Sequence, residues 1–221
     1  MAISSSLMHK GISRIRIGYA LDLVAYIIVT SLVAVIIGFI PAILTNTTAA
    51  LPSLLLGITS EFSWLLLGLV IMLVIIIIMG IAAMVFKVMG FLTLAKVNET
   101  RYGAASVGLA AIVLAYILGV LLLVLVIYTL MHNPQLMFKM APPLIMLTVT
   151  IIVLAIVGNA VLSVILWRLS DDYHSSTLLV GGVLIILTVV NAVLGFLGTI
   201  AVVMGLSEVM NRVSSIVVEE G

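Results

Sequence analysis

Five apolar stretches in this sequence are long enough to cross a lipid bilayer, and they limit the possible folds more than any other feature. An α-helix rises about 1.5 Å per residue, so a hydrocarbon core about 30 Å thick takes about 20 apolar residues. A spanning segment must also satisfy its own backbone hydrogen bonds, which a helix does. We therefore expect an all-α, polytopic transmembrane helical bundle. The predicted spans are 17–40, 63–86, 104–130, 144–166 and 178–206.

The composition excludes several classes of protein. Of 221 residues, 65% are hydrophobic and 8% are charged, whereas soluble domains are about half apolar and a quarter charged. The net charge of +1 excludes the basic patches of a nucleic-acid binder. The absence of cysteine excludes disulfides, thiolate nucleophiles and iron–sulfur clusters. We predict one membrane domain over 1–221, multi-pass in the cell membrane, with lipids and other membrane subunits or a second copy as partners.

The positive charges predict an orientation. Seven of the nine basic residues fall on one side of the five predicted spans, and only Lys139 and Arg212 fall on the other. Cytoplasmic loops carry the excess of lysine and arginine in membrane proteins. The N-terminus is therefore expected inside and the C-terminus outside.

Several boundaries depend on prolines and on short segments. Pro41 is expected to end the first span, and Pro142 and Pro143 to precede the fourth, because proline suits a helix start better than its interior. Segment 49–58 is too short to span, so we expect an interfacial or re-entrant helix there. Lys87 interrupts the apolar run after the second span and is expected to reach the headgroups.

The residues before the first span show helical periodicity. Met8, Ile12, Ile15 and Tyr19 share one face, and basic residues share another. This pattern is typical of a short helix on an anionic membrane surface. A frayed basic tail that only sets the orientation is the alternative.

Two stretches of the chain resemble each other. Residues 96–102 and 168–173 each form a charged turn that ends in tyrosine and leads into a glycine-containing span. A duplicated two-helix unit, 63–130 and 144–206, would explain the likeness. Apolar spans also resemble one another through composition alone.

Short motifs in the chain are similar to those of a known group of proteins. They are Gly11 to Gly18 before the first span, Trp167 to Ser170 with Tyr173 in the last inner turn, and Val180-Gly181-Gly182 after it. With these motifs the chain resembles uncharacterised archaeal multi-spanning membrane proteins of the domain-of-unknown-function type. The resemblance implies an archaeal membrane location and carries no assigned activity.

Polar residues inside the predicted spans are the candidates for function, because burying them in hydrocarbon is costly. Asp22 is either a proton or cation site balanced by Arg14 or Arg16, or an interfacial carboxylate that reaches water or pairs with those arginines. Asn159 and Asn191 either form part of a polar pathway or make interhelical hydrogen bonds. The pathway would continue through the hydroxyl residues Ser163, Thr188 and Thr199.

Small residues form stripes along two spans. Gly108 and Gly119 belong to the stripe of the third span, and Gly195 and Gly198 to that of the fifth. Such stripes let helix backbones approach closely in a membrane. We therefore assign these four glycines to helix packing.

The residues that usually carry chemistry are scattered. His9 and His174 fall on the predicted inner side and His132 on the outer side, so they cannot hold one haem. The zinc-protease, hydrolase and phosphate-loop motifs are absent from the sequence. Asp171 and Asp172 are adjacent and are either a solvated helix cap or a weak cation site. No catalytic, cofactor-binding or metal residue is predicted, and no cofactor.

These observations favour a structural or accessory subunit that packs against other membrane helices, and not an enzyme. The alternative is a small-solute or ion transporter or channel with a polar path near the fourth and fifth spans. A cavity at Asp22, Asn159 or Asn191 would favour transport. Asn46 begins a glycosylation sequon on the predicted outer side.

Overall fold

The computed structural model describes residues 2–46, 51–132, 134–189 and 191–219, and all of its secondary structure is helical. Five of the helices there are long and apolar enough to cross a membrane. Both the all-α class and the number of five such helices are confirmed. The elements are α1 (Ala2–Asn46), α2 (Leu51–Val97), α3 (Glu99–Tyr102), α4 (Ala105–His132), α5 (Pro134–Tyr173), α6 (Ser176–Ile186), the 3₁₀ turn η1 (Leu187–Val189) and α7 (Ala192–Glu219).

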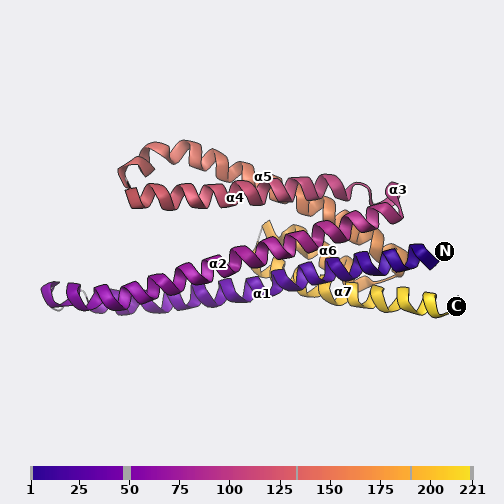
Figure 1. Cartoon of the computed structure of the whole chain (residues 1–221), viewed down its shortest axis with the longest axis horizontal. Helices are drawn as coiled ribbons and strands as arrows, with labels where there is room; N and C mark the ends of the chain where they lie inside the picture. The colour runs from indigo at the N-terminus through magenta and orange to yellow at the C-terminus, as the bar shows by residue number, and fades with distance from the viewer. Residues whose placement is uncertain (1, 47–50, 133, 190, 220–221) are drawn as a thin grey trace.

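The helices form three antiparallel pairs, α1 with α2, α4 with α5 and α6 with α7 (Figure 1). The third pair joins the other two, because α7 packs on α1 and α6 packs on α5. The first two pairs touch each other mainly through α2 and α4, and these two helices make a smaller contact than either pair makes internally. The bundle is therefore held together in large part by the α6–α7 pair.

Three predicted helix boundaries are wrong. Helix α1 continues through Pro41 to Asn46, and α5 begins at Pro134 and contains Pro142 and Pro143 in its interior. A proline removes one backbone hydrogen bond, which the rest of a long apolar helix tolerates. Residues 51–58 are the first turns of α2 instead of a separate interfacial helix. Residues 49 and 50, and two of the three residues of the Asn46 sequon, lie outside the described residues.

The fifth predicted span, 178–206, is wrong as a single crossing. The chain divides there into α6, η1 and α7. Helix α6 has 11 residues, so it is about 16 Å long and reaches through about half of a hydrocarbon core. Within this stretch, residues 193–215 of α7 are long and apolar enough to cross a membrane by length and composition.

Helices α6 and α7 run in opposite directions and touch through glycines. A Cβ added to Gly205 would lie 2.5 Å from the backbone nitrogen of Leu178, and one added to Gly181 would lie 2.7 Å from that of Val202. Residue numbers therefore fall along one helix as they rise along the other. The stripe that looked like one face of one helix is the seam of a helical hairpin.

Because the hairpin turns back, the N- and C-termini lie at the same end of the bundle (Figure 1). Five complete crossings would instead put them at opposite ends, and the side of the membrane that each terminus faces stays a prediction. Arg212, assigned to the outer side with the C-terminus, donates a hydrogen bond to the backbone oxygen of Tyr173 at the end of α5. We call this end the charged end. Its basic residues are Lys10, Arg14, Arg16, Lys96, Arg101, Arg168 and Arg212.

The buried core lies toward the charged end. Met8, Ile12, Ile15 and Tyr19 form one buried face of α1, as their spacing indicates. The segment is neither a surface helix nor a frayed tail, because it is the first part of α1 and packs on α2, where a Cβ on Gly11 would meet Gly90.

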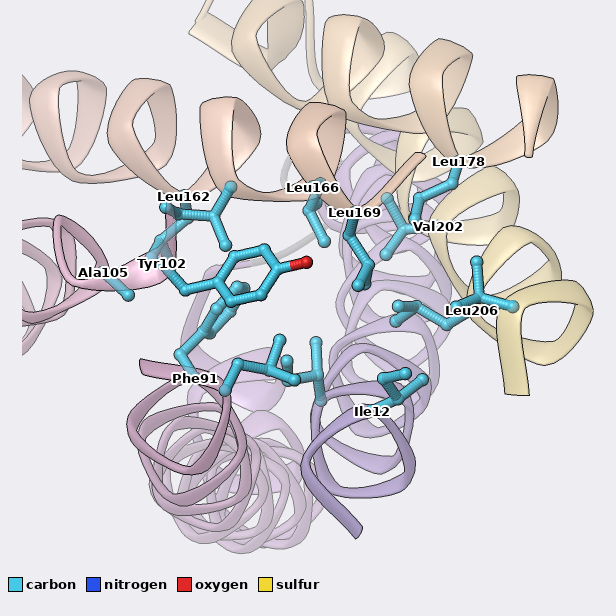
Figure 2. Packing of buried hydrophobic residues seen from close by; sticks show 14 of the residues in the cluster. Ile12, Phe91, Tyr102, Ala105, Leu162, Leu166, Leu169, Leu178, Val202 and Leu206 are labelled. Atoms are coloured by element: carbon cyan, nitrogen blue, oxygen red, sulfur yellow. The ribbon is translucent and has the colours of Figure 1, made fainter. Parts of the chain in front are cut away.

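Residues from all seven α-helices contribute to this core. Figure 2 shows Ile12 and Phe91 directed toward the same space as Tyr102, Leu169 and Leu206. All five side chains are almost completely shielded from solvent. Such dense packing closes the charged end of the bundle.

The helix pairs do not follow the predicted repeat of 63–130 and 144–206. The first predicted unit combines α2 with α4, whereas α2 packs mainly on α1 and α4 mainly on α5. The second unit contains a hairpin that the first lacks. Duplication of a two-helix unit stays a prediction.

Candidate functional site

An ion pair lies between the first two long helices. The ammonium Nζ of Lys87 in α2 donates a hydrogen bond to the carboxylate of Asp22 in α1. The same Nζ lies 4.8 Å from the centre of the Tyr19 ring, within the range of a cation–π interaction. The two charged side chains are only 17% and 26% exposed, respectively. The pair is therefore held inside the bundle.

Glycine makes this ion pair possible. A Cβ on Gly18 would lie 2.6 Å from Cγ of Lys87 and 2.8 Å from the backbone oxygen of Ala83. Only a glycine lets α1 and α2 approach so closely beside the lysine stem. The sequence thus brings the two charges together through a close backbone contact.

Two sequence-based assignments for these charges are wrong. Asp22 was expected to pair with Arg14 or Arg16, but Arg14 donates to Thr93 at 3.4 Å and Arg16 donates to Ser207 at 3.3 Å. Lys87 was expected to reach the headgroups, but it turns inward to the carboxylate. Inside a membrane protein, two opposite charges that pair have a lower free energy than the same two charges buried separately.

The ion pair opens onto a cavity of about 350 Å³. All five long helices and the α6–η1 segment contribute residues to its wall. Its polar lining combines the ion pair with tyrosine, amide and hydroxyl groups. These polar residues are Tyr19, Asp22, Tyr26, Lys87, Asn159, Thr188 and Thr199.

Several of these polar groups lack a hydrogen-bond partner among the described residues, and an amide and a hydroxyl are among them. The side chains of Asn159 and Thr188 make no hydrogen bond to any of the described residues, although both face the cavity. Thr199 instead donates to the backbone oxygen of Gly195 at 2.8 Å. The structure thus brings Asp22 and Asn159 to one cavity together with the two predicted threonines, and leaves an amide and a hydroxyl available to a solute or to water.

Asn191 does not belong to this cavity. Its side-chain oxygen accepts a hydrogen bond from the backbone nitrogen of Val193 at 2.8 Å, at the start of α7. An asparagine in this position satisfies a free N–H group at a helix N-terminus. The expected approach of Asn159 and Asn191 is absent because the hairpin turns between their helices. Ser163 is buried, lacks a described hydrogen-bond partner, and lies outside the cavity wall.

A smaller cavity of about 110 Å³ lies on another side of the same ion pair. Asp22 and Lys87 line both cavities, and Tyr116 adds a hydroxyl group to the lining of the smaller one. The Tyr116 hydroxyl donates to the backbone oxygen of Ile77 at 2.9 Å. The lysine side chain therefore has free space on two sides.

Polar contacts tie the helices together at the charged end. Tyr102 donates to Asp172, which also pairs with Arg101. Burial raises the pKa of Tyr102 above its ordinary value, and the hydrogen bond to Asp172 raises it further. Because these contacts occupy Asp172, the adjacent pair with Asp171 is not a free cation site.

A second group of contacts ties the base of the hairpin to itself. Glu208 of α7 accepts hydrogen bonds from Ser175 at 2.7 Å and from Thr177 at 2.8 Å. Ser175 in turn caps α6 by accepting from the backbone nitrogen of Leu178 at 3.3 Å. His174, just before this cap, has a positive φ of 52° and makes the tight turn between α5 and α6. The structure thus gives His174 a backbone role in this turn.

The four glycines assigned to packing differ in their surroundings. A Cβ on Gly108 would meet Val161 and Gly158, one on Gly195 would meet Thr188, and one on Gly198 would meet the backbone of α6. Gly119 differs, because a Cβ there would meet nothing within 4 Å. Gly119 thus makes no close contact with another described helix, and its packing role stays a prediction. Gly119 lines an apolar cavity of about 400 Å³ among α2, α4 and α5.

Sequence reasoning missed the Asp22–Lys87 pair, although a signal was present. Asp22 is the one acid inside the first predicted span, and Lys87 is the one base that interrupts the apolar run of the second. Two opposite charges on adjacent apolar helices are expected to meet. The signal was lost because Lys87 was assigned to the headgroups.

Comparison with known proteins gives a family but no activity. No curated protein and no solved structure matches the chain. A protein family described as a protein of unknown function (DUF973) matches residues 9–220. The match agrees with the expected resemblance to an uncharacterised group, and the archaeal origin stays a prediction. Over nearly its whole length, the chain belongs to the DUF973 family.

Proposed function

We propose that this protein binds a small polar solute in the cavity beside Asp22 and Lys87 and carries it across the cell membrane. The observation that supports the proposal most directly is the polar wall of that cavity, to which all five long helices contribute. Transporter sites are typically built in this way, near the middle of the bilayer and from several helices.

The unpaired groups argue that the cavity is filled with water or a solute. An amide transferred to an apolar environment without a hydrogen bond costs about 2–7 kcal/mol. Asn159 and Thr188 would carry such a cost if lipid or empty space faced them. A cavity of about 350 Å³ has room for several waters or one small organic molecule.

The interrupted helix supports the same function. Non-helical backbone at membrane depth is tolerated only inside the protein or beside a water-filled cavity. The chain leaves the α-helical path at η1, and Thr188 in this turn lines the cavity. The hairpin tip therefore ends at the proposed solute site.

Cysteine labelling tests whether water enters the cavity. The chain has no cysteine, so Asn159→Cys introduces a single reactive thiol. Val157→Cys is the matched control, because Val157 lies on the same helix about 3 Å away along the axis and is 46% exposed on the apolar surface. A thiol reacts as its thiolate, which requires water. We expect a water-soluble thiosulfonate to label Asn159→Cys and not Val157→Cys. Equal protection of both would contradict the proposal.

Flux measurements test transport itself. Purified protein in lipid vesicles is challenged with labelled small cations, anions and neutral polar solutes. We expect uptake of one class, and we expect Asp22→Asn to abolish it while Asp171→Asn leaves it unchanged. Vesicles that remain tight to all three classes, although Asn159→Cys is labelled, would reduce the function to binding without transport.

One observation favours the second candidate, an accessory subunit without enzymatic activity. A Cβ on Gly119 would meet none of the described residues within 4 Å, and this glycine faces an apolar cavity among three helices. Small residues at such positions accept a partner helix in membranes. Co-purification in mild detergent tests this: a stoichiometric partner that Gly119→Leu releases would favour the subunit function. Release by the control Val124→Phe, on the exposed face of α4, would contradict it.

A further inference from the structure

We propose that the solute of this cavity is a small organic cation that displaces the ammonium of Lys87 from Asp22. This inference depends on the proposed function, because it assigns a substrate class to the same cavity. It is carried by the joint position of a carboxylate, an aromatic face and free space next to them.

Lys87 already occupies an ammonium site. Its Nζ donates to Asp22 and lies 4.8 Å from the centre of the Tyr19 ring. A carboxylate and an aromatic face are the two groups by which proteins bind alkylammonium ions. The ammonium of Lys87 therefore occupies the position that the ammonium group of a ligand would take.

The cavity wall favours a cation over an anion. Among the described lining residues, Asp22 is the one carboxylate and Lys87 the one permanent cation. The carboxylate is the more exposed of the two side chains, at 26% against 17%. A second aromatic ring, Tyr26, also lines the cavity and rests edge-on against Phe196. A cation that enters the cavity can reach the more exposed carboxylate of Asp22. An anion would have to bind Lys87, which already contacts that carboxylate and the Tyr19 ring.

The displaced lysine has a place to go. Lys87 also borders the smaller cavity of about 110 Å³, where Tyr116 and Gly80 form part of the wall. Its long stem lets the ammonium move between the two cavities while its backbone stays in α2. Helix α2 does not have to unfold for this movement. The exchange of the lysine ammonium for an external one therefore involves only side-chain motion.

The lysine would make cation binding weak and reversible. A tethered competitor acts at a high effective concentration, so an external cation binds only as well as it outcompetes that group. When the solute leaves, the lysine returns and neutralises Asp22. The empty carrier is thus spared an unpaired charge in the membrane.

Equilibrium binding of labelled methylammonium to the full-length protein in detergent tests the inference. We expect Lys87→Met to bind it about tenfold more tightly than the wild type, because the internal competitor is gone. Asp22→Asn should abolish binding, and Asp22→Glu should retain part of it. Lys96→Met is the control, since Lys96 is an exposed lysine of the same helix. Each variant is first required to elute as the wild type does in size-exclusion chromatography.

If Lys87→Met does not fold, a wild-type measurement replaces it. Nonlabelled methylammonium should then compete with the labelled probe, and acetate and glycerol at equal concentration should not. Binding of labelled acetate or glycerol to the wild type in place of methylammonium would overturn the cation inference and leave the solute cavity standing. Failure of all three probes to bind, together with protection of Asn159→Cys from labelling, would overturn the proposed function as well.

Discussion

Gly108 of α4 lies against Gly158 of α5 so closely that a Cβ on Gly158 would lie 2.9 Å from the backbone oxygen of Gly108. A comparable contact joins the other long pair, where a Cβ on Gly90 would lie 2.8 Å from the backbone oxygen of Gly11. Backbone oxygens cannot turn aside as the end of a flexible side chain can. Close glycine contacts therefore fix where each antiparallel pair crosses.

We predict that Gly158→Ala destabilises the bundle, whereas Gly119→Ala does not. The added methyl group of the first variant must push α4 and α5 apart, at a cost of about 1–3 kcal/mol. The second variant meets nothing within 4 Å, so alanine gains helix propensity of up to about 1 kcal/mol. Thermal unfolding in detergent measures both. A Gly158→Ala variant at least as stable as Gly119→Ala would show that the helices are not in close contact there.

The hairpin predicts that both termini face the same side of the membrane. Single cysteines at Ser6 and Ser215, both exposed, should react with an impermeant maleimide from one side of oriented vesicles. A cysteine at Lys139, near the start of α5, should react from the other side. Five complete crossings would place Ser6 and Ser215 on opposite sides. The positive-charge rule further predicts that the shared side is the cytoplasm.

The role of Asn191 can be separated from that of Asn159. Because Asn191 caps α7, Asn191→Ala should lower the free energy of unfolding by about 1 kcal/mol, and Asn191→Asp should largely restore it. Neither variant should change solute binding. Asn159→Ala should instead weaken binding and leave stability nearly unchanged, since its amide has no described partner to lose. The opposite pattern would place Asn191 in the site and Asn159 in the structural framework.

Tyr102 predicts a loss of stability in alkali. Burial raises its pKa, so the folded protein holds the phenolic proton more tightly than the unfolded chain does. Its contribution is complete below the unfolded pKa of about 10, and it is lost as pH rises from there toward the folded pKa. One such group changes stability by at most about 1.4 kcal/mol per pH unit. Chemical unfolding between pH 9 and about 11.5 should show a shallower decline for Tyr102→Phe than for the wild type. Identical slopes would mean that this phenol is not shielded.

Sequence patterns predicted the elements that depend on local periodicity. Met8, Ile12, Ile15 and Tyr19 share a face by their spacing alone, and that face is the buried side of α1. The apolar runs predicted the number of long helices for the same reason. These features follow from the 3.6-residue spacing of apolar residues and from the length of each apolar run. Both can be seen in a single sequence without a structure.

Features that depend on contacts between distant residues were not predictable in the same way. The segment 187–191 after α6 contains neither glycine nor proline, and its two polar residues, Thr188 and Asn191, do not interrupt the apolar run for long. Hydropathy therefore counted one span where the chain turns back. Gly181 and Gly205 were visible as small residues, but their spacing fits one face of a helix as well as two facing seams. Only the fold distinguishes these arrangements.

The candidate site was partly visible. Asp22 and Asn159 stood out as polar residues in apolar helices, and Thr188 and Thr199 were named as a continuation. Lys87 was named but was assigned the wrong direction, because a lysine stem can reach either lipid headgroups or a carboxylate. Its partner is 65 residues away along the chain. Such long-range pairing lies beyond what spacing can show.

The returning hairpin also affects how the chain enters a membrane during synthesis. Glu208 and Arg212 follow the apolar residues that α7 brings back to the charged end. A final complete crossing would drag both through hydrocarbon, and each charge would cost several kcal/mol on the way. With the charged end in the cytoplasm, as the positive-charge rule predicts, insertion of α6 and α7 as a loop would leave the end of α7 on the side where synthesis takes place. Glu208 and Arg212 would then reach their partners without being translocated.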